Sequence, residues 1–203
     1  ISMMFQDPAT SLDPLMRLGK QIALPLRRHR GLRGAALREA IDRALAEVAL
    51  PDPARIARSF PYEVSGGQRQ RVALAMTLAA SPSLLIADEP TTALDVTVQR
   101  TVLDLLDEVT RERGVSLLFI SHDLAVVQYM ADRIGVMYLG RIVEEGPAHE
   151  VVKNPKHPYT KALIDSIPVP DPEFKHDENA IKLTGEPPSA INPPEGCRFR
   201  PRC

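Results

Sequence analysis

The sequence predicts an α/β fold organised on a parallel sheet. Residues 84–87 are four consecutive apolar residues between Pro82 and Pro90, a run too short for a helix and typical of a strand buried on both faces of a parallel sheet. Residues 115–120 form a second run of this kind, and residues 96–113 between the two repeat apolar side chains at helical spacing. A strand, a crossover helix and a strand in this order favour a right-handed βαβ unit.

Titratable side chains follow both predicted strands. Asp88 and Glu89 end the first strand, and His122 follows the second. Because the carboxyl ends of parallel strands lie at one edge of the sheet, where α/β proteins bind ligands, Glu89 and His122 can approach one ligand. Ionised carboxylates resist burial, so a metal-binding or proton-transfer role suits the acidic pair. A solvated acidic turn and a capping histidine are the structural alternatives.

The composition indicates an ordinary globular chain of 203 residues, with 44% hydrophobic and 25% charged residues. A net charge of −1 gives no electrostatic case for a nucleic-acid partner, which normally requires a basic excess. No apolar run reaches the roughly 18 residues that span a bilayer, so we expect a cytosolic location. Residues 1–5 resemble the middle or end of a strand without an initiator Met, and we expect a further segment to precede them.

The chain before the acidic pair is expected to hold one strand and a helical insertion. Residues 1–5 form the strand, and a loop with several turn formers follows from Gln6. Residues 15–49 repeat apolar side chains at helical spacing. The basic run at residues 27–30 suits a phosphate or partner patch, but a solvated helix end explains it as well, and we assign it no function.

A helix with an unusual first turn follows the insertion. Ser65 is a typical N-cap, and Gly66, Gly67 and Gln68 form the first turn of a helix with an apolar stripe. Exposed backbone N–H groups at a helix N-terminus bind anions, and glycine lets a phosphate approach the backbone closely. A plain serine cap with a flexible turn is the structural alternative.

The second half of the chain is expected to contain short elements. Asp95 is placed to cap the crossover helix. Short helices are then expected over residues 124–130, 148–152 and 159–167. A hairpin is expected over residues 133–145. Prolines dominate from Pro168 onward, which predicts an extended tail with little secondary structure.

In this order, the motifs strongly resemble those of the nucleotide-binding subunit of an ABC transporter, and the resemblance covers nearly the whole chain. It implies the α/β fold of a partial P-loop NTPase, with a parallel sheet core, a helical subdomain and a proline-rich C-terminal extension. It assigns Gln6 to the Q-loop, residues 65–68 to the signature motif, Leu84–Asp88 to the Walker B strand, Glu89 to the catalytic carboxylate, Asp95 to the D-loop and His122 to the switch histidine.

The resemblance also implies that ATP and Mg²⁺ are the cofactors. Asp88 would hold Mg²⁺, and Gln6 would touch the metal or the attacking water. Glu89 would orient and deprotonate that water, while His122 would hydrogen-bond the γ-phosphate. Ser65 and its neighbours would grip a nucleotide bound to the opposite subunit, so hydrolysis is expected to be a property of a dimer.

One motif of the family is missing from the sequence. The phosphate-binding loop G-x-x-x-x-G-K-[S/T] does not occur, since Gly19-Lys20 lacks the upstream glycine and the following hydroxyl. In the family this loop precedes the Q-loop, which fits a chain that begins after it. We therefore expect residues 1–203 alone to bind ATP weakly and to hydrolyse it negligibly.

The C-terminal part resembles the extension of oligopeptide and dipeptide importer ATPases, which nickel importers share. It implies peptide import at the cytoplasmic face of the membrane, with a second ABC ATPase subunit, two transmembrane permeases and an extracytoplasmic substrate-binding protein as partners. Residues 154–163, 185–188 and 196–203 carry this resemblance. The expected segments are residues 1–8 for the Q-loop end of the catalytic core, 9–80 for the helical subdomain, 81–152 for the RecA-like core and 153–203 for the extension.

The two cysteines, Cys197 and Cys203, cannot form a disulfide framework for the core. Some importer ATPases that the chain resembles hold an iron–sulfur cluster in this region, so both residues are candidate cluster ligands in a longer chain. A cluster normally needs about four thiolates, and two cannot complete one. Two ordinary cytosolic thiols are the alternative.

Two other functions fit part of the pattern. A soluble ABC-type ATPase acting on DNA or ribosomes would carry long coiled-coil insertions or duplicated cassettes, and the sequence shows neither. A non-catalytic interaction module would fit a natural protein without the phosphate-binding loop. The intact mass of the native protein discriminates this module from a longer ATPase.

Overall fold

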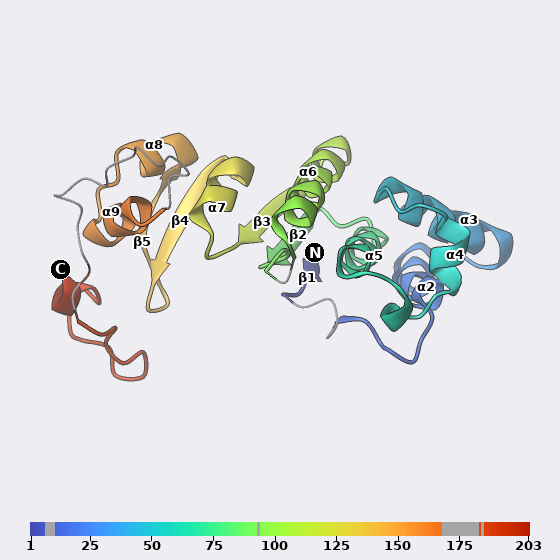
Figure 1. Cartoon of the computed structure of the whole chain (residues 1–203), viewed down its shortest axis with the longest axis horizontal. Coiled ribbons are helices and arrows are strands. Elements are labelled where there is room, and N and C mark those ends of the chain that lie inside the picture. Colours follow the sequence, from blue (N-terminus) through green and yellow to red (C-terminus); the bar gives the residue numbers. More distant parts are fainter. Residues whose placement is uncertain (7–10, 93, 168–182, 184) are drawn as a thin grey trace. The chain divides into compact units, whose positions relative to one another are not determined.

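The computed structural model of the chain describes residues 1–6, 11–92, 94–167, 183 and 185–203. The chain divides into two compact units, of which unit 1 spans Ile1–Ser121 and unit 2 spans His122–Cys203 (Figure 1). Each unit has its own helices and strands. The division into four functional segments that the resemblance implies stays a prediction.

Unit 1 contains a parallel sheet in which the strands have the order β1-β2-β3. The strands are β1 (Ser2–Met4), β2 (Leu84–Asp88) and β3 (Ser116–Ile120). β2 lies in the middle and pairs in parallel with both neighbours. The strand–helix–strand order expected from residues 84–120 is therefore confirmed as a parallel pair.

The two faces of this sheet are covered unequally by the described residues. Leu85 and Ala87 of β2 are fully buried, whereas Ile86 between them is only partly buried. Met3 and Leu118 are in register with Ile86 and are 40% and 50% exposed. The expectation that residues 84–87 are buried on both faces is therefore wrong for the described residues. Helix α5 packs on β1, while the side chains of Met3, Ile86 and Leu118 are left at least partly exposed in the described part of the chain.

Short helices form the other part of unit 1. They are α2 (Leu18–Arg30), α3 (Gly34–Glu47), α4 (Pro53–Arg58), a 3-10 turn (Pro61–Glu63) and α5 (Gly66–Leu78). The helical region expected over residues 15–49 is confirmed but is broken by Gly31, whose φ of 64° ends α2. Gly19 lets α2 approach α4 closely, because a Cβ at this position would lie 2.8 Å from the carbonyl oxygen of Ala57.

Helix α6 (Val96–Glu112) connects β2 to β3 and packs on α5. Its apolar stripe is buried as the spacing predicts at Val102, Leu105, Leu106 and Val109, whereas Val98 is only partly buried. The Arg113 guanidinium, just after the helix, donates to the carbonyl oxygen of Leu78 at the end of α5 (3.0 Å). This contact joins the C-terminal ends of the two helices.

Unit 2 is built around an antiparallel hairpin. Its elements are α7 (Leu124–Met130), β4 (Arg133–Tyr138), β5 (Arg141–Pro147), α8 (Ala148–Lys153), α9 (Pro158–Asp165) and a 3-10 turn (Arg200–Arg202). Leu139 and Gly140 have φ values of 46° and 75°, as a tight hairpin turn requires. The predicted short helices and hairpin are confirmed. None of the helices in the described parts of the chain is long and apolar enough to cross a membrane.

An aromatic cluster anchors the C-terminal residues in unit 2. Phe199 is 1% exposed, and its ring contacts those of Tyr138, Tyr159 and His157. The predicted tail of extended structure lies partly outside the described residues, at 168–182 and 184. Residues 185–199 form no helix or strand, as predicted, while a 3-10 turn follows at Arg200–Arg202 and Phe199 is buried against the hairpin and α9, which the prediction did not include.

Candidate functional site

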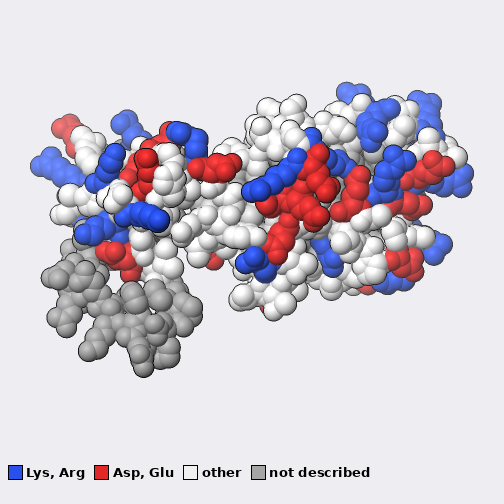
Figure 2. Space-filling model, turned by 90° about the horizontal axis from the view of Figure 1, so that it is seen from above, with Lys and Arg blue, Asp and Glu red and all other residues white. Residues whose placement is uncertain are grey.

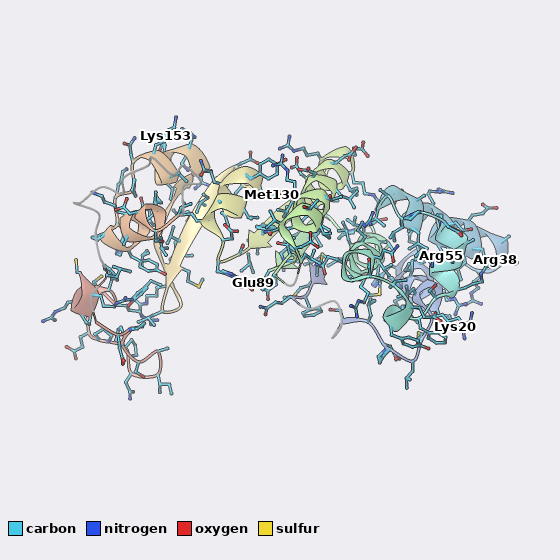
Figure 3. All side chains as sticks on the ribbon, viewed as in Figure 1. Lys20, Arg38, Arg55, Glu89, Met130 and Lys153 are labelled. Carbon is cyan, nitrogen blue, oxygen red and sulfur yellow. The ribbon has the colours of Figure 1, made fainter. Side chains whose placement is uncertain are left out.

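The candidate site lies at the carboxyl edge of β2. Asp88 is the last residue of the strand, and Glu89 follows with a φ of 43°, a left-handed conformation that turns the chain sharply. The Glu89 amide donates to the carbonyl oxygen of Ile120 at the end of β3 (2.9 Å). Glu89, labelled in Figure 3, is thus fixed at the place where both strands end.

Gln6 reaches Glu89 across the sheet. The Gln6 side-chain amide donates to Glu89 Oε2 at 2.7 Å, although the two residues are 83 positions apart in the chain. The parallel pairing of β1 with β2 produces this contact, because Met4 is in register with Ala87 and both strands end at the same edge. The structure therefore brings together two of the residues that the sequence selects.

Thr92 also contacts Glu89, which sequence reasoning missed. The Thr92 hydroxyl donates to Glu89 Oε2 at 2.9 Å. The Thr92 amide lies 3.4 Å from the carbonyl oxygen of Glu89, so residues 89–92 form a turn with Pro90 in its second position. The spacing Glu-Pro-Thr-Thr was the available signal, since such a turn brings its first and fourth residues together.

Ser65 and Gln68 form a reciprocal cap at the start of α5. The Gln68 amide donates to Ser65 Oγ (3.3 Å), and the Ser65 amide donates to the Gln68 side-chain oxygen (3.1 Å). The predicted serine cap is confirmed. The Gln68 side chain has a structural task here in addition to any contact with a nucleotide.

The two glycines of this turn lie against α6 and the loop before it. A Cβ at Gly67 would lie 2.6 Å from Cγ1 of Val98, closer than side-chain carbons approach, while a Cβ at Gly66 would lie 3.8 Å from Leu94. Close helix packing is thus a reason for Gly67 that sequence reasoning missed. The phosphate-approach role of these glycines stays a prediction.

A buried amide joins α5 to the loop after Glu89. Gln70 is 1% exposed, and its side-chain Nε2 donates to the carbonyl oxygen of Pro90. Polar side chains are seldom this buried without a partner, and Pro90 supplies one. No spacing in the sequence indicates this contact.

Asp95 caps α6, because its carboxylate accepts a hydrogen bond from the Val98 amide at 3.0 Å. The cap is confirmed, and a further role of Asp95 toward a nucleotide stays a prediction. His122 is the first residue of unit 2. Its approach to the ligand of Glu89 also stays a prediction.

The oxygen donors at this edge fit Mg²⁺. Asp88 presents a partly buried carboxylate at the strand end, and Gln6 supplies an amide oxygen. Mg²⁺ prefers oxygen ligands and keeps several waters or phosphate oxygens, so it needs only one or two carboxylates from the protein. In the described ranges, no group of three or more His, Cys, Asp and Glu side chains is placed to hold a metal by itself.

The structure does not support Cys197 and Cys203 as ligands of an iron–sulfur cluster. Cys197 and Cys203 are both exposed, and they belong to no metal-binding group within the residues that the structure describes. Two thiolates fall short of the roughly four that an iron–sulfur cluster requires. We therefore do not propose an iron–sulfur cluster for these residues.

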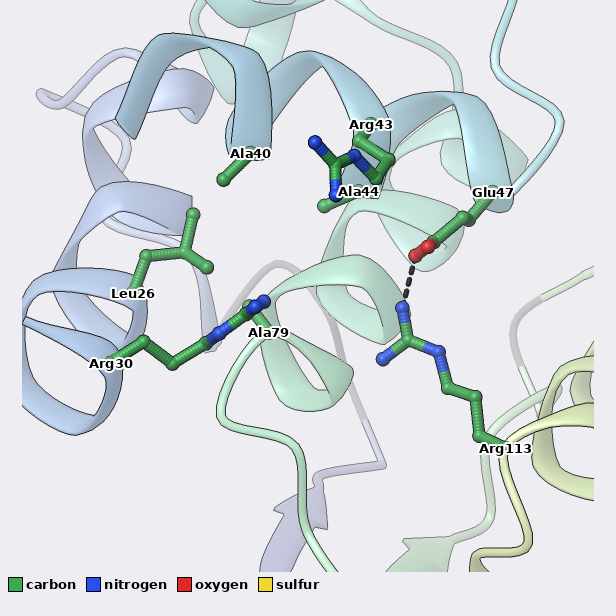
Figure 4. A pocket seen from close by; sticks show the side chains of 8 residues that line it. All are labelled: Leu26, Arg30, Ala40, Arg43, Ala44, Glu47, Ala79 and Arg113. Atoms are coloured by element: carbon green, nitrogen blue, oxygen red, sulfur yellow. Dashed lines mark hydrogen bonds and ion pairs between the residues drawn. The ribbon is translucent and has the colours of Figure 1, made fainter. Parts of the chain in front are cut away.

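A small pocket in unit 1 lies among helix ends and has no residue in common with the candidate site (Figure 4). Arg30 and Arg43 line it together with an ion pair between Arg113 and Glu47. Residues 18–58 carry nine Lys and Arg against four Asp and Glu, and Figure 2 shows basic side chains over these helices. Two of these arginines have a structural role. Arg30 lies in the last turn of α2, and Arg113 donates to the last carbonyl of α5, so each positive charge stabilises the negative end of a helix dipole.

Two family models match the chain. The model for "ABC transporter" matches residues 1–92, and the model for "Oligopeptide/dipeptide transporter, C-terminal region" matches residues 143–203. The first includes Gln6, the turn at Ser65 and the pair Asp88–Glu89. The second includes the aromatic cluster of unit 2.

Curated proteins are similar over the whole chain. The oligopeptide transport ATP-binding protein OppF of Salmonella typhimurium is 50% identical, and the dipeptide transport ATP-binding protein DppD of Bacillus subtilis is 44% identical. A putative peptide import ATP-binding protein of Brucella ovis is 48% identical. Each alignment includes 100% of this chain and 60% or 61% of the relative. The chain thus spans about three fifths of the length of these relatives.

Solved structures confirm the fold. The ATP-binding cassette MJ0796, in a dimeric post-hydrolysis state bound to ADP and Pi, superposes with a TM-score of 0.62 and 30% identity over 72% of this chain and 63% of that chain. The protein cbiO1 of Clostridium perfringens, part of the transporter complex cbiONQ, superposes with a TM-score of 0.66 and 28% identity over 75% of this chain and 59% of that chain. The predicted α/β fold of an ABC ATPase is therefore confirmed.

Proposed function

The chain belongs to the ABC transporter family of ATP-binding proteins, and on this premise we propose that it is part of a subunit that hydrolyses ATP to power the import of peptides. The names of its relatives support this substrate class, since they refer to oligopeptide, dipeptide or peptide transport. The match of residues 143–203 to the C-terminal region of oligopeptide/dipeptide transporters supports it independently.

The observation that carries the ATPase proposal is the contact between Gln6 and Glu89. A side-chain amide and two adjacent carboxylates meet at the carboxyl edge of a parallel sheet, where α/β proteins bind nucleotides. Phosphoryl transfer to water needs a positioned nucleophile and neutralised phosphate charge, more than covalent chemistry by the protein. The edge of β2 offers groups suited to both tasks.

In the proposed mechanism, Glu89 orients the attacking water and accepts its proton. The side-chain nitrogen of Gln6 donates to the Glu89 carboxylate and so helps to hold it beside the attacking water. The side-chain oxygens of Asp88 and Gln6 would hold Mg²⁺. When bound, Mg²⁺ neutralises charge on the phosphate oxygens. His122 donates a hydrogen bond to the γ-phosphate.

The start of α5 serves a second nucleotide in this proposal. Ser65, Gly66 and Gly67 form the N-terminal turn of a helix of 13 residues, whose backbone N–H groups and dipole favour an anion. These residues grip the γ-phosphate of a nucleotide bound to a second ATPase subunit. Asp95 is the D-loop aspartate in this proposal, in addition to its role as the cap of α6. The dimeric state of the similar cassette MJ0796 supports this arrangement.

The proposed partners are a second ABC ATPase subunit, two transmembrane permeases and an extracytoplasmic substrate-binding protein. The subunit would then be peripheral at the cytoplasmic face of the membrane. The four segments expected from the sequence correspond to a core with the Q-loop, a helical subdomain, a RecA-like core and an importer-type extension. None of the relatives reported above is named for action on DNA or ribosomes, and we do not propose that function.

The test compares the complete gene product with its Glu89→Gln variant. ATP turnover should fall by at least about a hundredfold, because the amide cannot accept the proton of water, while ATP binding is retained. Glu108→Gln is the matched control, since Glu108 is an exposed carboxylate on α6 outside the site. Its turnover should be unchanged.

Three results would each contradict a part of the proposal. Unchanged turnover in the Glu89→Gln variant would move the catalytic base to another residue. A complete gene product that binds ATP but never hydrolyses it, alone or with its permeases, would indicate a non-catalytic module. Uptake of labelled peptides by vesicles with the reconstituted importer tests the substrate class, and uptake of nickel alone would contradict it.

A further inference from the structure

Thr92 is the residue on which the further inference rests. Its hydroxyl lies 2.9 Å from Glu89 Oε2, the same oxygen that accepts the Gln6 amide at 2.7 Å. A hydroxyl has one proton to donate, and the alternative acceptor, the carbonyl oxygen of Glu89, is more distant at 3.3 Å. The carboxylate is therefore the better partner of this hydroxyl.

The turn itself does not depend on the Thr92 hydroxyl. Pro90 fixes the backbone dihedral of the second turn position, and the Thr92 backbone amide faces the Glu89 carbonyl oxygen at 3.4 Å. The buried amide of Gln70 binds the Pro90 carbonyl, and the Leu94 amide donates to the Thr91 carbonyl at 3.1 Å. With the backbone held by these contacts, the hydroxyl is available to hold a side chain.

A glutamate side chain needs such support to act as a base. It has three rotatable bonds, and a displacement of about 1 Å can cost roughly a hundredfold in rate. Gln6 reaches Glu89 from the segment that follows β1, whereas Thr92 reaches it from within the same turn. Two donors from different segments restrict the carboxylate more than either does alone.

We propose that Thr92 is a positioning residue for Glu89, holding its carboxylate where it can accept the proton of the attacking water. This assignment rests on the proposed ATPase function. It goes beyond the resemblance, which gives Thr92 no role. Thr92 does not touch the nucleotide in this account and acts only through Glu89.

The experiment compares Thr92→Val with Thr92→Ser in the complete gene product. Valine keeps the shape of threonine without its hydroxyl, and serine keeps the hydroxyl without the methyl group. We expect Thr92→Val to lower kcat about tenfold with an unchanged KM for ATP, and Thr92→Ser to restore most of the turnover. Thr101→Val is the control, because it removes an exposed threonine hydroxyl on α6 and should leave turnover unchanged.

The outcomes separate this proposal from the proposed function. If Glu89→Gln abolishes turnover while Thr92→Val matches the unmodified protein, the role of Thr92 is overturned and the ATPase function stands. If Thr92→Val and Thr92→Ser lose turnover equally, in proportion to a lower thermal midpoint, Thr92 has only a structural role and the proposal also fails. If the unmodified gene product hydrolyses no ATP, both proposals fail together.

Discussion

The side-chain amide of Gln70 donates a hydrogen bond to the backbone carbonyl of Pro90, and this joins helix α5 to the loop that follows Glu89. Gln70 is 1% exposed, so water cannot replace this contact if it is lost. The helix that begins at Ser65 and the turn that orients Glu89 are therefore linked inside unit 1. One buried side chain connects two elements of the candidate site.

The first prediction concerns this contact. Gln70→Met keeps a similar length and volume but leaves the Pro90 carbonyl without its donor. We expect the free energy of unfolding of unit 1 to fall by about 1–3 kcal/mol, the cost of an unpaired buried polar group. Urea unfolding followed by helical circular dichroism measures the change.

Gln128→Met is the matched control for Gln70→Met. Gln128 lies on α7 and is exposed, so the same chemical change should alter stability by no more than about 0.5 kcal/mol. Equal stability of Gln70→Met and the unmodified chain would show that the Pro90 carbonyl finds another partner.

The second prediction separates packing from phosphate binding at Gly67. Gly67→Ala places a Cβ 2.6 Å from Cγ1 of Val98, and valine in a helix has little freedom to rotate away. We expect a loss of about 1–3 kcal/mol in the free energy of unfolding. Adding Val98→Ala removes the clashing methyl group and should recover most of this loss.

Gly66→Ala is the control for this pair, because its new Cβ would have only an ordinary contact with Leu94 at 3.8 Å. Its stability should stay near that of the unmodified chain. A double variant, Gly67→Ala with Val98→Ala, that is stable but has lost ATP turnover in the complete gene product would support the phosphate-approach role. A double variant no more stable than Gly67→Ala would contradict the packing argument.

The sequence alone predicts those parts of the fold that depend on local patterns. The two strands that flank α6 follow from short apolar runs, and the caps at Ser65 and Asp95 follow from side chains placed just before apolar stripes. The strand pattern places Glu89 at a sheet edge, but only the family resemblance brought Gln6 to the same site, and the structure adds their direct contact.

Contacts between side chains of separate elements were not predictable in this way. The bond from Gln70 to Pro90 and the fit of Gly67 against Val98 depend on how α5 and α6 approach the sheet edge, which no periodicity encodes. The burial of Phe199 was missed for a related reason. A proline-rich composition indicates little secondary structure, but a single aromatic residue in it can still be buried in a cluster.

The third prediction concerns the pH dependence of unit 2. Burial by itself raises the pKa of Glu144, but the backbone amides of Lys156 and His157, which donate to its carboxylate at 2.8 and 2.9 Å, and the nearby polar Thr160 outweigh burial and hold the pKa below its ordinary value of 4.5. The folded state therefore binds fewer protons at this carboxylate than the unfolded state. Its stabilising contribution is complete above about pH 4.5 and is lost as the pH falls through the lowered pKa.

Thermal unfolding of unit 2 between about pH 6 and pH 3, followed by tyrosine circular dichroism, measures this dependence. Glu144→Gln should lower the midpoint at pH 6 and flatten its fall toward acid. Glu195→Gln, at an exposed carboxylate in the same unit, should leave the profile unchanged. If the unfolding midpoints of Glu144→Gln and of the unmodified chain fall identically with pH, these hydrogen bonds do not stabilise the charged carboxylate over its protonated form.

The last prediction tests whether Phe199 anchors the C-terminal residues. Its ring centre lies 5.2 Å from that of Tyr138, 5.4 Å from that of His157 and 5.6 Å from that of Tyr159, so Phe199→Ala removes a buried ring worth about 3–5 kcal/mol. That loss exceeds what a short segment retains from its other contacts, and we expect residues 196–203 to detach. Trypsin should then cleave after Arg198 much faster than in the unmodified chain, as intact-mass measurements over time would show.

Two further variants serve as controls for Phe199→Ala. Ile191→Ala removes an apolar side chain that is 89% exposed and should not change the cleavage rate. Phe199→Leu keeps an apolar group in the cluster and should give an intermediate rate. Equal cleavage of Phe199→Ala and the unmodified chain would mean that the hydrogen bond from Arg198 to the Leu139 carbonyl is sufficient to hold the segment.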